Sequence, residues 1–373
     1  MDGRALLFLN NQGLAGTGGG VTILRALVAG LSADHAITVA SLDPPGPAPD
    51  GVRQVTLPAV PSGSWHLAPL TRARHLARVL PPALLAAADT VVAMDCHFGP
   101  ALAALPAERV AYLSLSCIPR QEWFAAPGAR MIPRVMQYAW LERGLARRAG
   151  RVVAASHRHA AELARFEAVG RTPVILHPVF PAGPLTPARR RSQPLLVCLG
   201  RLEPVKRFAL ALEVVARFRD LDWRLVFAGD GPLAPALRRR AETLGIGARV
   251  RFLGQAGDVP ALLAEADLLL HPSAYESFGI AVFEAMRAGV PPVCAAGRAV
   301  TACAEFATDG EDAMFVDFDR VPEAAGAIRA LLLDPGERAR RGAAARVAAA
   351  RLLGRDYVAA FRAEVLAPLG GAR

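Results

Sequence analysis

The chain has 373 residues, of which 53% are hydrophobic and 20% charged, and its formal net charge is +10. This length favours two domains, with a single large barrel as the alternative, and the composition excludes a disordered chain. The basic excess is spread over both halves without an RNP-like, zinc-finger or helix-turn-helix pattern, so nucleic acid is not an expected partner, whereas a peripheral membrane contact stays open.

The cysteines and the apolar runs bear on location. Five widely spaced cysteines form no C-x-x-C pair, which argues against a zinc or redox site and for reduced thiols. The apolar run Ala5–Leu9 is too short for a signal peptide, and no run reaches the roughly 18 residues of a membrane span. We therefore expect a cytoplasmic protein.

The N-terminal half alternates short apolar runs with helical patterns. A strand is predicted over Leu6–Asn10, and the glycine-rich loop Gly13–Gly20 leads from it into a helix over Val21–Leu31. Further predicted strands are Ala36–Ala40, Thr90–Met94, Val110–Leu115 and Val152–Ala155, and further predicted helices are Leu70–Val79 and Arg134–Arg148. This alternation predicts a parallel sheet wound with helices.

A proline-rich stretch interrupts the alternation. Residues 177–194 contain five prolines and an arginine triplet, so the domain boundary is placed there. We expect an N-terminal domain over residues 1–182 and a C-terminal domain over residues 190–354. A last helix at about residues 355–373 is expected to pack back on the first domain.

The second half restarts the same pattern. The predicted strands are Leu195–Leu199, Arg224–Phe227, Val250–Leu253, Leu268–Leu270, Pro292–Cys294 and Met314–Val316, and Glu337–Leu353 reads as a surface helix. The expected fold is α/β, with two Rossmann-like, doubly wound domains facing a cleft. Ligands of such sheets bind beyond the carboxyl ends of the strands, so function is expected in the strand-to-helix loops.

The loop after the strand Leu195–Leu199 carries the first charged cluster. Gly200 permits close backbone approach, and Arg201 and Lys206 bring two positive charges to a loop that leads into a helix. Lys206 is the only lysine in the chain. This arrangement suits a diphosphate leaving group, although two solvated loop residues are the alternative interpretation.

A pair of glutamates forms the second cluster. Glu276 precedes a helix expected to start near Phe278, and Glu284 lies on that helix among apolar residues. A glutamate in such a run is costly to bury unless it accepts hydrogen bonds, and sugar hydroxyls are suitable donors. The alternative is a capping or surface glutamate, an interpretation that fits Glu276 better than Glu284.

These residues resemble a known family, the retaining GT-B glycosyltransferases of family 4, also called glycosyl transferases group 1. The resemblance extends from Gly200 to about Val316 and depends on an ordered set of motifs. These motifs are GRLEPVK (Gly200–Lys206), GDG (Gly229–Gly231), VRFLG (Val250–Gly254), HPS (His271–Ser273) and ESFGIAVFE (Glu276–Glu284). Single pieces would be weak evidence, whereas their order is specific.

The resemblance implies a role for each matching residue. Arg201 and Lys206 would bind the donor diphosphate after Gly200, Glu284 would bond the ribose hydroxyls, and Glu276 would bond hydroxyls of the transferred sugar. The backbone at Leu253 and Gly254 would contact the base. The helix start at Phe278, Gly279 and Ile280 would offer N–H groups to phosphate or sugar.

The N-terminal domain resembles the family less closely. The loop Thr17, Gly18, Gly19, Gly20 occupies the place where such enzymes pass a loop beside the donor phosphate and the acceptor, which implies an acceptor-binding domain. His97, after a predicted strand, matches a histidine that many members place near the reaction centre. The alternative is that His97 is an ordinary hydrogen-bonded histidine. Asp95 either orients its ring or only caps a helix.

One loop departs from the family pattern. Family members usually carry paired glycines before a glutamate here, whereas Ala295–Glu305 is longer and keeps only Gly297. An unusual donor sugar or reaction is therefore left open, and Arg298 either meets a charged group or, as we expect, points into solvent.

Aromatic side chains of the first half are candidates for an acceptor surface. They are Trp65, Trp123, Phe124 and Trp140. The basic helix Arg134–Arg148 is expected to pack on the sheet with its arginines in solvent, and contact with a membrane surface is the alternative.

The resulting hypothesis is a retaining, metal-independent, hexosyltransferase-like enzyme that moves a sugar from a nucleoside diphosphate sugar to an acceptor. We expect no metal and no cofactor, a UDP-sugar donor, and a small molecule, lipid or glycan as the acceptor. The alternatives are a sugar-nucleotide epimerase or hydrolase of the same fold, and a non-catalytic nucleotide-sugar-binding partner. A dehydrogenase is disfavoured, because Val21 stands where the third glycine of G-x-G-x-x-G belongs.

Overall fold

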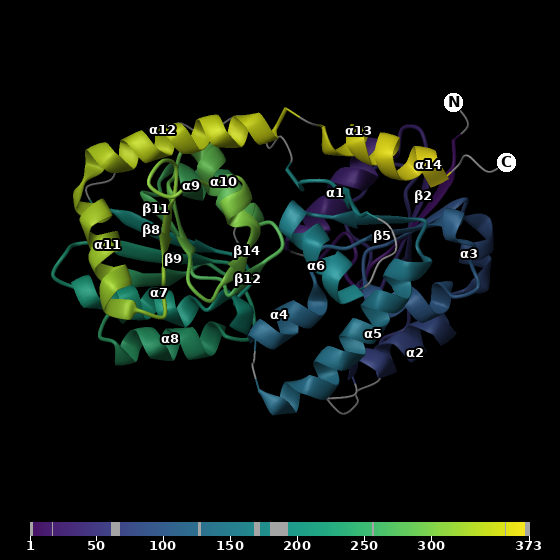
Figure 1. The fold of residues 1–373 in the computed structure, drawn as a ribbon, viewed down its shortest axis with the longest axis horizontal. Coiled ribbons are helices and arrows are strands. Elements are labelled where there is room, and N and C mark those ends of the chain that lie inside the picture. Colours follow the sequence, from purple (N-terminus) through teal and green to yellow (C-terminus); the bar gives the residue numbers. More distant parts are fainter. Residues whose placement is uncertain are drawn as a thin grey trace. The chain divides into compact units, whose positions relative to one another are not determined.

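A computed structural model describes residues 3–16, 18–60, 68–125, 128–167, 172–179, 193–255, 257–354 and 356–369. The chain divides into two compact units (Figure 1). Unit 1 comprises Met1–Trp123, Pro127–Phe180 and Arg355–Arg373, and unit 2 comprises Phe124–Ala126 and Pro181–Gly354. The proline-rich boundary stretch falls mostly outside the described residues, as do Thr17 and Trp65.

The sheet of unit 1 is parallel and has the order β3-β2-β1-β4-β5-β6-β7. Its strands are β1 (Ala5–Leu9), β2 (Ala36–Ser41), β3 (Arg53–Thr56), β4 (Thr90–Ala93), β5 (Val110–Leu113), β6 (Arg151–Ala154) and β7 (Val174–Ile175). The central strands are buried on both faces, which explains why they read as continuous apolar runs.

Helices cover both faces of this sheet. They are α1 (Gly19–Leu31), α2 (Ala68–Val79), α3 (Pro82–Ala87), α4 (Ile118–Ala125, whose last residues belong to unit 2), α5 (Ile132–Arg148) and α6 (His157–Glu167). Helix α1 begins two residues before the predicted start, because Gly18 adopts a positive φ of 99° as its cap. Helix α5 likewise begins at Ile132, with Pro133 in its first turn, where proline is tolerated.

The last segment of the chain packs on unit 1. It forms α13 (Tyr357–Phe361), a π-helical turn η9 (Arg362–Leu366) and α14 (Ala367–Leu369). Helix α13 lies against α1 (Figure 1). The missing side chain of Gly30 makes room there for Val358, and Arg362 pairs with Asp34.

The sheet of unit 2 is also parallel, in the order β10-β9-β8-β11-β13-β15. Its strands are β8 (Leu195–Leu199), β9 (Arg224–Ala228), β10 (Val250–Phe252), β11 (Leu268–His271), β13 (Pro292–Ala295) and β15 (Met314–Val316). All six lie at the positions that the sequence predicts. A separate two-stranded ribbon, β12 (Tyr275–Glu276) with β14 (Val300–Thr301), was not predicted.

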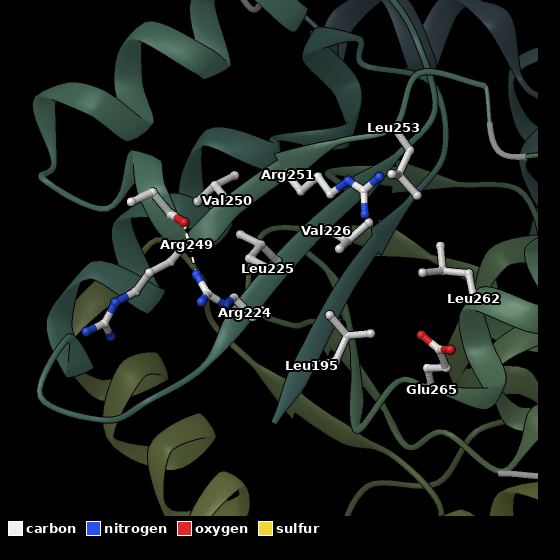
Figure 2. A pocket seen from close by; sticks show the side chains of 11 residues that line it. Leu195, Arg224, Leu225, Val226, Arg249, Val250, Arg251, Leu253, Leu262 and Glu265 are labelled. Carbon is white, nitrogen blue, oxygen red and sulfur yellow. Dashed lines mark hydrogen bonds between the residues drawn. The ribbon is translucent and has the colours of Figure 1, made fainter. Parts of the chain in front are cut away.

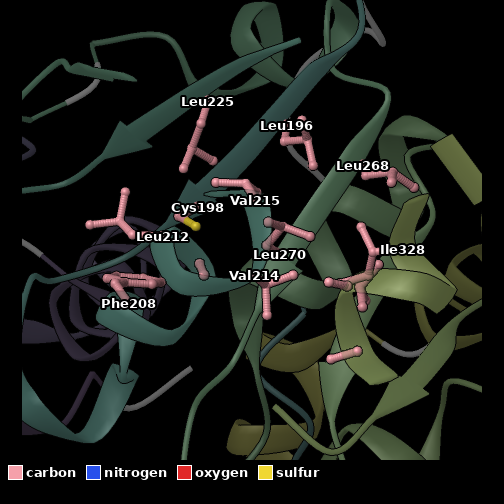
Figure 3. Packing of buried hydrophobic residues seen from close by; sticks show 14 of the residues in the cluster. Leu196, Cys198, Phe208, Leu212, Val214, Val215, Leu225, Leu268, Leu270 and Ile328 are labelled. Carbon is pink, nitrogen blue, oxygen red and sulfur yellow. The ribbon is translucent and has the colours of Figure 1, made fainter. Parts of the chain in front are cut away.

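The helices of unit 2 are α7 (Phe208–Val215), α8 (Ala234–Thr243), α9 (Val259–Ala264), α10 (Ile280–Ala288), α11 (Val321–Leu333) and α12 (Pro335–Leu352). One core lies between the sheet and α7, α8 and α11, where apolar side chains such as Phe208, Leu225 and Ile328 point toward one another (Figure 3). On the other face α10 packs against α9 and α12. The predicted surface helix thus corresponds to α12, which Asp334 caps.

None of the helices in the described part of the chain combines the length and apolarity that crossing a bilayer needs. No disulfide joins the five cysteines, all of which are buried.

Candidate functional site

In unit 2 the loop after β8 is shaped by glycines. Gly200 has a φ of 134°, and Gly229 and Gly231 have φ values of 144° and 157°. A Cβ on Gly229 would lie 2.0 Å from the Gly200 carbonyl oxygen, and one on Gly231 would lie 2.6 Å from the Leu202 carbonyl oxygen. The GDG motif is therefore required for two loops to touch at the carboxyl ends of β8 and β9.

Lys206 and Glu276 form the charged centre of this loop cluster. The Lys206 Nζ donates to Glu276 Oε1 at 2.6 Å, and both side chains are largely buried. The Nε2 of His271 lies 2.9 Å from the same oxygen, at ion-pair distance but outside hydrogen-bond alignment. Burial alone would raise the pKa of Glu276, but the neighbouring Lys206 and His271 hold that pKa well below its usual range. Glu276 is therefore a permanent carboxylate and a hydrogen-bond acceptor, not an acid.

Three buried polar atoms near this pair have no hydrogen-bond partner among the described residues. They are His271 Nδ1, Ser273 Oγ and Arg207 Nη2. All three surround Pro272, whose carbonyl oxygen accepts from Arg207 Nε at 2.9 Å. Buried polar atoms are normally paired, so these loops are suited to a polar ligand.

Arg207 is a member of the cluster that sequence reasoning missed. It has the left-handed φ of 49°, which is uncommon for a residue with a side chain, and its Nη1 also contacts Asp319 at 3.0 Å. Arg207 thus joins the Lys206 loop, the Pro272 loop and the loop after β15. Its only signal in the sequence is its position beside Lys206.

The loop Ala295–Glu305 departs from the family pattern and supports Glu276. Its residues Val300 and Thr301 form β14, which pairs with Tyr275 and Glu276 of β12. Further along, the Cys303 thiol contacts the Phe278 carbonyl oxygen at 3.6 Å. Arg298 is exposed, as expected. The longer loop therefore fixes the strand that carries Glu276, which sequence reasoning had placed in a loop.

Helix α10 begins later than predicted. Gly279, with a φ of 101°, forms its N-cap, so the first helical residue is Ile280 instead of Phe278. A side chain at position 279 would collide with the Cys303 sulfur, 2.6 Å from the added Cβ. The first turn holds no acidic residue, and the Val282 N–H already donates to the Gly279 carbonyl oxygen at 2.9 Å. The first N–H groups of a helix precede its internal hydrogen bonds, so this helix start can accept an anion.

Glu284 lies on α10 and differs from Glu276 in having no hydrogen-bond partner among the described residues. Burial raises its pKa to about 7, and the nearby Arg287 opposes that rise. Such a carboxyl group would be stabilised as a carboxylate by hydroxyl donors from a ligand.

Arg201, Leu253 and Gly254 are further predicted site residues of unit 2. Arg201 pairs with Glu203 at 2.8 Å and is half exposed. Gly254 accepts a hydrogen bond from the Gly229 N–H at 2.7 Å, which ties the segment of Leu253 and Gly254 to the GDG loop.

In unit 1 the predicted glycine loop enters α1. Gly18 caps the helix, Gly19 and Gly20 are its first residues, and Gly20 lies against Leu115 so closely that an added Cβ would be 2.8 Å from the leucine. The helix start has no acidic residue in its first turn.

His97 is buried beside a carboxylate. Asp95 Oδ1 accepts from the His97 backbone N–H at 2.9 Å and contacts the ring Nδ1 at 2.5 Å, so Asp95 both caps and orients. Burial would raise the pKa of Asp95, but His97 keeps it lowered. The ring is 3% exposed and packs edge-on against Tyr138. Asn11 also hydrogen-bonds to Asp95.

A second buried polar network in unit 1 was not predicted. Glu142 of α5 accepts from Tyr112 at 2.7 Å and from the Ile118 N–H at 3.1 Å. Ser114 bridges Glu142 to His159. Burial raises the pKa of Glu142 to about 8 and lowers that of His159 to about 3. This network links α5 and α6 to β5, which is a structural role.

Asp95 and the carboxylates of two Asp-x-Asp sequences already contact other side chains. Asp95, Cys96 and His97 offer ligand atoms within 4.8 Å of one another, yet Asp95 and His97 pair with each other. The chain also contains two Asp-x-Asp sequences. Residues 220 and 222 contact Arg329 and Gln193, and residues 317 and 319 contact Arg320 and Arg207.

A cavity of about 460 Å³ lies elsewhere in unit 2, beside β8, β9, β10 and α9 (Figure 2). Leu195, Arg224 and Val250 stand at the amino ends of their strands, away from the Lys206 loop, and Arg251 extends over the same hollow. Leu253, just after β10, also lines the cavity and is the one predicted donor-site residue among its lining residues.

Two family models match the chain. Residues 187–348 match Glycosyl transferases group 1, and residues 18–180 match Glycosyl transferase 4-like domain. Together the two matches cover most of the chain.

Curated relatives resemble part of the chain. A GDP-mannose-dependent alpha-(1-6)-phosphatidylinositol dimannoside mannosyltransferase of Mycobacterium tuberculosis is 38% identical over 158 residues, which are 42% of this chain and 39% of the relative. The chain thus matches about two fifths of the length of this curated relative.

Solved structures resemble the whole chain. Sucrose-phosphate synthase from Thermosynechococcus elongatus has a TM-score of 0.81 at 17% identity, over 99% of this chain and 100% of that one. HepE of Anabaena, solved in complex with UDP-glucose, has a TM-score of 0.72 at 19% identity, over 98% and 99%. At these identities the likeness is one of fold.

Proposed function

Because the chain belongs to the group 1 glycosyl transferases and has the GT-B fold, we propose that it transfers a sugar from a nucleoside diphosphate sugar to an acceptor nucleophile. The observation that carries this proposal is the Lys206–Glu276 pair among unpartnered buried polar atoms. A bound nucleoside diphosphate sugar supplies the phosphate oxygens and hydroxyls that such groups would bond.

Each residue has a distinct role in the proposed reaction. Lys206, Arg201 and the N–H groups at Gly279 and Ile280 bind the diphosphate and stabilise the charge that develops as it leaves. Glu276 accepts hydrogen bonds from the sugar hydroxyls, and Glu284 accepts them from the ribose. These positive groups take the place of a cation, so the proposed reaction is metal-independent.

The proposal also covers the stereochemistry and the acceptor. Retention of configuration is proposed because the motif set resembles retaining enzymes. His97 is proposed to position the acceptor, since Asp95 fixes its ring. The mycobacterial relative is a GDP-mannose-dependent phosphatidylinositol dimannoside mannosyltransferase, whereas HepE was solved with UDP-glucose. We expect a uridine donor, with guanosine as the second base, and a lipid, glycan or small molecule as the acceptor.

The proposal is tested by calorimetry and thermal unfolding in EDTA with UDP, GDP, ADP, dTDP and NAD. One nucleoside diphosphate should raise the unfolding midpoint, because it binds the folded state alone. Lys206→Ala and Glu284→Ala should abolish the shift, and Arg217→Ala and Glu311→Ala, at exposed positions of unit 2, should keep it.

Removing Lys206 leaves a buried carboxylate without its partner and lowers stability by itself. The double variant Lys206→Gln/Glu276→Gln removes both charges, and it should fold while losing nucleotide binding. Release of the nucleoside diphosphate from the matching sugar nucleotide should then depend on an added acceptor. A response to NAD alone, or to none of the ligands, would refute the proposal.

A further inference from the structure

Helix α5 of unit 1 has two apolar faces. Tyr138, Leu141 and Leu145 are buried in the unit. On the opposite side Ile132, Met136 and Trp140 are 49%, 63% and 64% exposed. These three residues are spaced by four and therefore form one stripe, about 12 Å long, along the outer face.

The stripe is unusual for this chain. Among the described residues, six large apolar side chains are exposed, and half of them belong to this single helix. Isolated exposed apolar residues need no explanation, whereas three in register on one helix face indicate a surface that is covered in use.

The surroundings of the stripe are positively charged. Arg143 on α5 and Arg130 just before it are exposed and have no ion-pair partner among the described residues. The helix contains one acid, Glu142, which is fully buried, and the nearby Glu122 is neutralised by Arg134 at 2.7 Å. No acidic side chain of α5 is therefore exposed to oppose these arginines.

The neighbouring helix α2 extends this surface. It packs beside α5 (Figure 1), contains no acidic residue, and exposes Arg74 and Arg78. An apolar row with a tryptophan, bordered by arginines on two adjacent helices, has the composition of a helix that lies in the headgroup region of a bilayer.

We propose that the outer face of α5, with the arginines around it, docks unit 1 on an anionic lipid surface. Ile132, Met136 and Trp140 would enter the acyl boundary, and the guanidinium groups would contact lipid phosphates. A bilayer fits this convex, single row of side chains, because it needs no complementary groove. The positive field without exposed acids on α5 favours anionic over neutral lipid. The inference does not depend on the proposed transferase activity.

The test is sedimentation of the purified protein with vesicles, either pure phosphatidylcholine or containing about one-third phosphatidylglycerol. The protein should bind the anionic vesicles, and raising salt from about 0.05 M to about 0.5 M should weaken binding. Met136→Ser/Trp140→Ser and Arg130→Gln/Arg143→Gln should each reduce the partition coefficient by about tenfold or more. Both pairs are exposed, so an unchanged unfolding midpoint is the folding control.

Matched variants in unit 2 test whether binding depends on the α5 face or only on the number of exposed apolar residues and arginines in the chain. Leu333→Ser/Val347→Ser removes two equally exposed apolar residues of unit 2, and Arg217→Gln/Arg239→Gln removes two exposed arginines of unit 2. Both should bind like the native chain. Binding should also shift tryptophan emission to the blue, and Trp140→Phe should keep binding while losing most of that shift. The proposal is overturned by equal losses in the unit 2 variants, by an unchanged emission, or by no partition into anionic vesicles; the last result would point to a protein partner.

Discussion

The surroundings of two glutamates in unit 2 shift their pKa values in opposite directions. Glu276 has Lys206 and His271 within 3 Å, and its pKa is depressed. Glu284 has only the more distant charge of Arg287, and burial raises its pKa to about 7. The same side chain is thus a fixed carboxylate at one position and a titrating group at the other.

This difference predicts how nucleotide affinity depends on pH. If hydroxyl donors bind the Glu284 carboxylate, the complex favours the deprotonated form, so affinity should rise as pH increases through about 7. Below that pH the dissociation constant should increase by up to about tenfold for each pH unit. Calorimetry between pH 6 and pH 8, a range that includes the Glu284 pKa of about 7, would measure how the dissociation constant changes.

Glu284→Gln is the control for this pH effect. The variant should bind more weakly at high pH and show a flatter profile, whereas Glu311→Gln, at an exposed position, should keep the native slope. A slope that persists in Glu284→Gln would assign the titration to another group.

The sequence was informative at the residue scale wherever a motif is local. Gly200 directly follows β8, and Lys206 lies in the turn after it, as predicted. Glu276 lies on the unpredicted strand β12 instead of a loop, and Gly279 caps α10 one residue after the predicted helix start. Arg207 and the Glu142 network could not be inferred, because their partners lie 65 and 30 residues away in sequence and are set by tertiary packing. The roles assigned to the matching residues remain predictions.

At the scale of elements, apolar runs predicted the long buried strands, and β8 and β15 have the predicted bounds. Strand β3 was missed because its sequence, RQVT, has no apolar run, and β7, β12 and β14 were missed because two residues show no periodicity. The β12–β14 ribbon exists because of contacts between distant segments. Through this ribbon, the loop Ala295–Glu305 holds the strand that carries Glu276.

Helix α13 with its continuation is predicted to stabilise unit 1. Phe361 and Val365 are fully buried, Arg362 pairs with Asp34, and Arg4 donates to the Leu366 carbonyl oxygen at 2.7 Å. Gly30→Leu should push against Val358, 2.7 Å from an added Cβ, and lower the free energy of unfolding by about 1–3 kcal/mol. Urea unfolding would measure the loss.

The matched control for this substitution is Gly326→Leu on α11 of unit 2, where nothing lies within 4 Å of an added Cβ. It should leave the stability nearly unchanged or raise it slightly, since glycine is a poor helix former. Equal losses from both substitutions would show that α13 packing is not the cause.

At the scale of the molecule, each unit has its own core. One cluster lies within residues 196–332 and another within residues 7–163. Trp223, fully buried with its indole N–H bonded to the Phe218 carbonyl oxygen, belongs to the core of unit 2.

Ligand binding should therefore stabilise the two units unequally. A nucleoside diphosphate that binds the loops around Lys206 should raise the temperature at which Trp223 emission shifts to the red. The ligand should add about RT ln(1 + [L]/Kd) to the free energy of unfolding of unit 2, and the transition temperature should rise accordingly. Trp65→Phe/Trp123→Phe/Trp140→Phe leaves Trp223 as the last of the four tryptophans in the sequence, so the emission then reports on unit 2. An equal shift in circular dichroism and in Trp223 emission would show that the units unfold together.

The packing of residues 356–369 on α1 also has a consequence for the order of events during synthesis. Unit 2 is an insertion between two segments of unit 1, so the ribosome finishes the whole of unit 2 before it releases the segment that completes unit 1. Until then the α1 surface around Gly30 and Asp34 lacks its cover. The half of the protein that is begun first is therefore the half that is completed last.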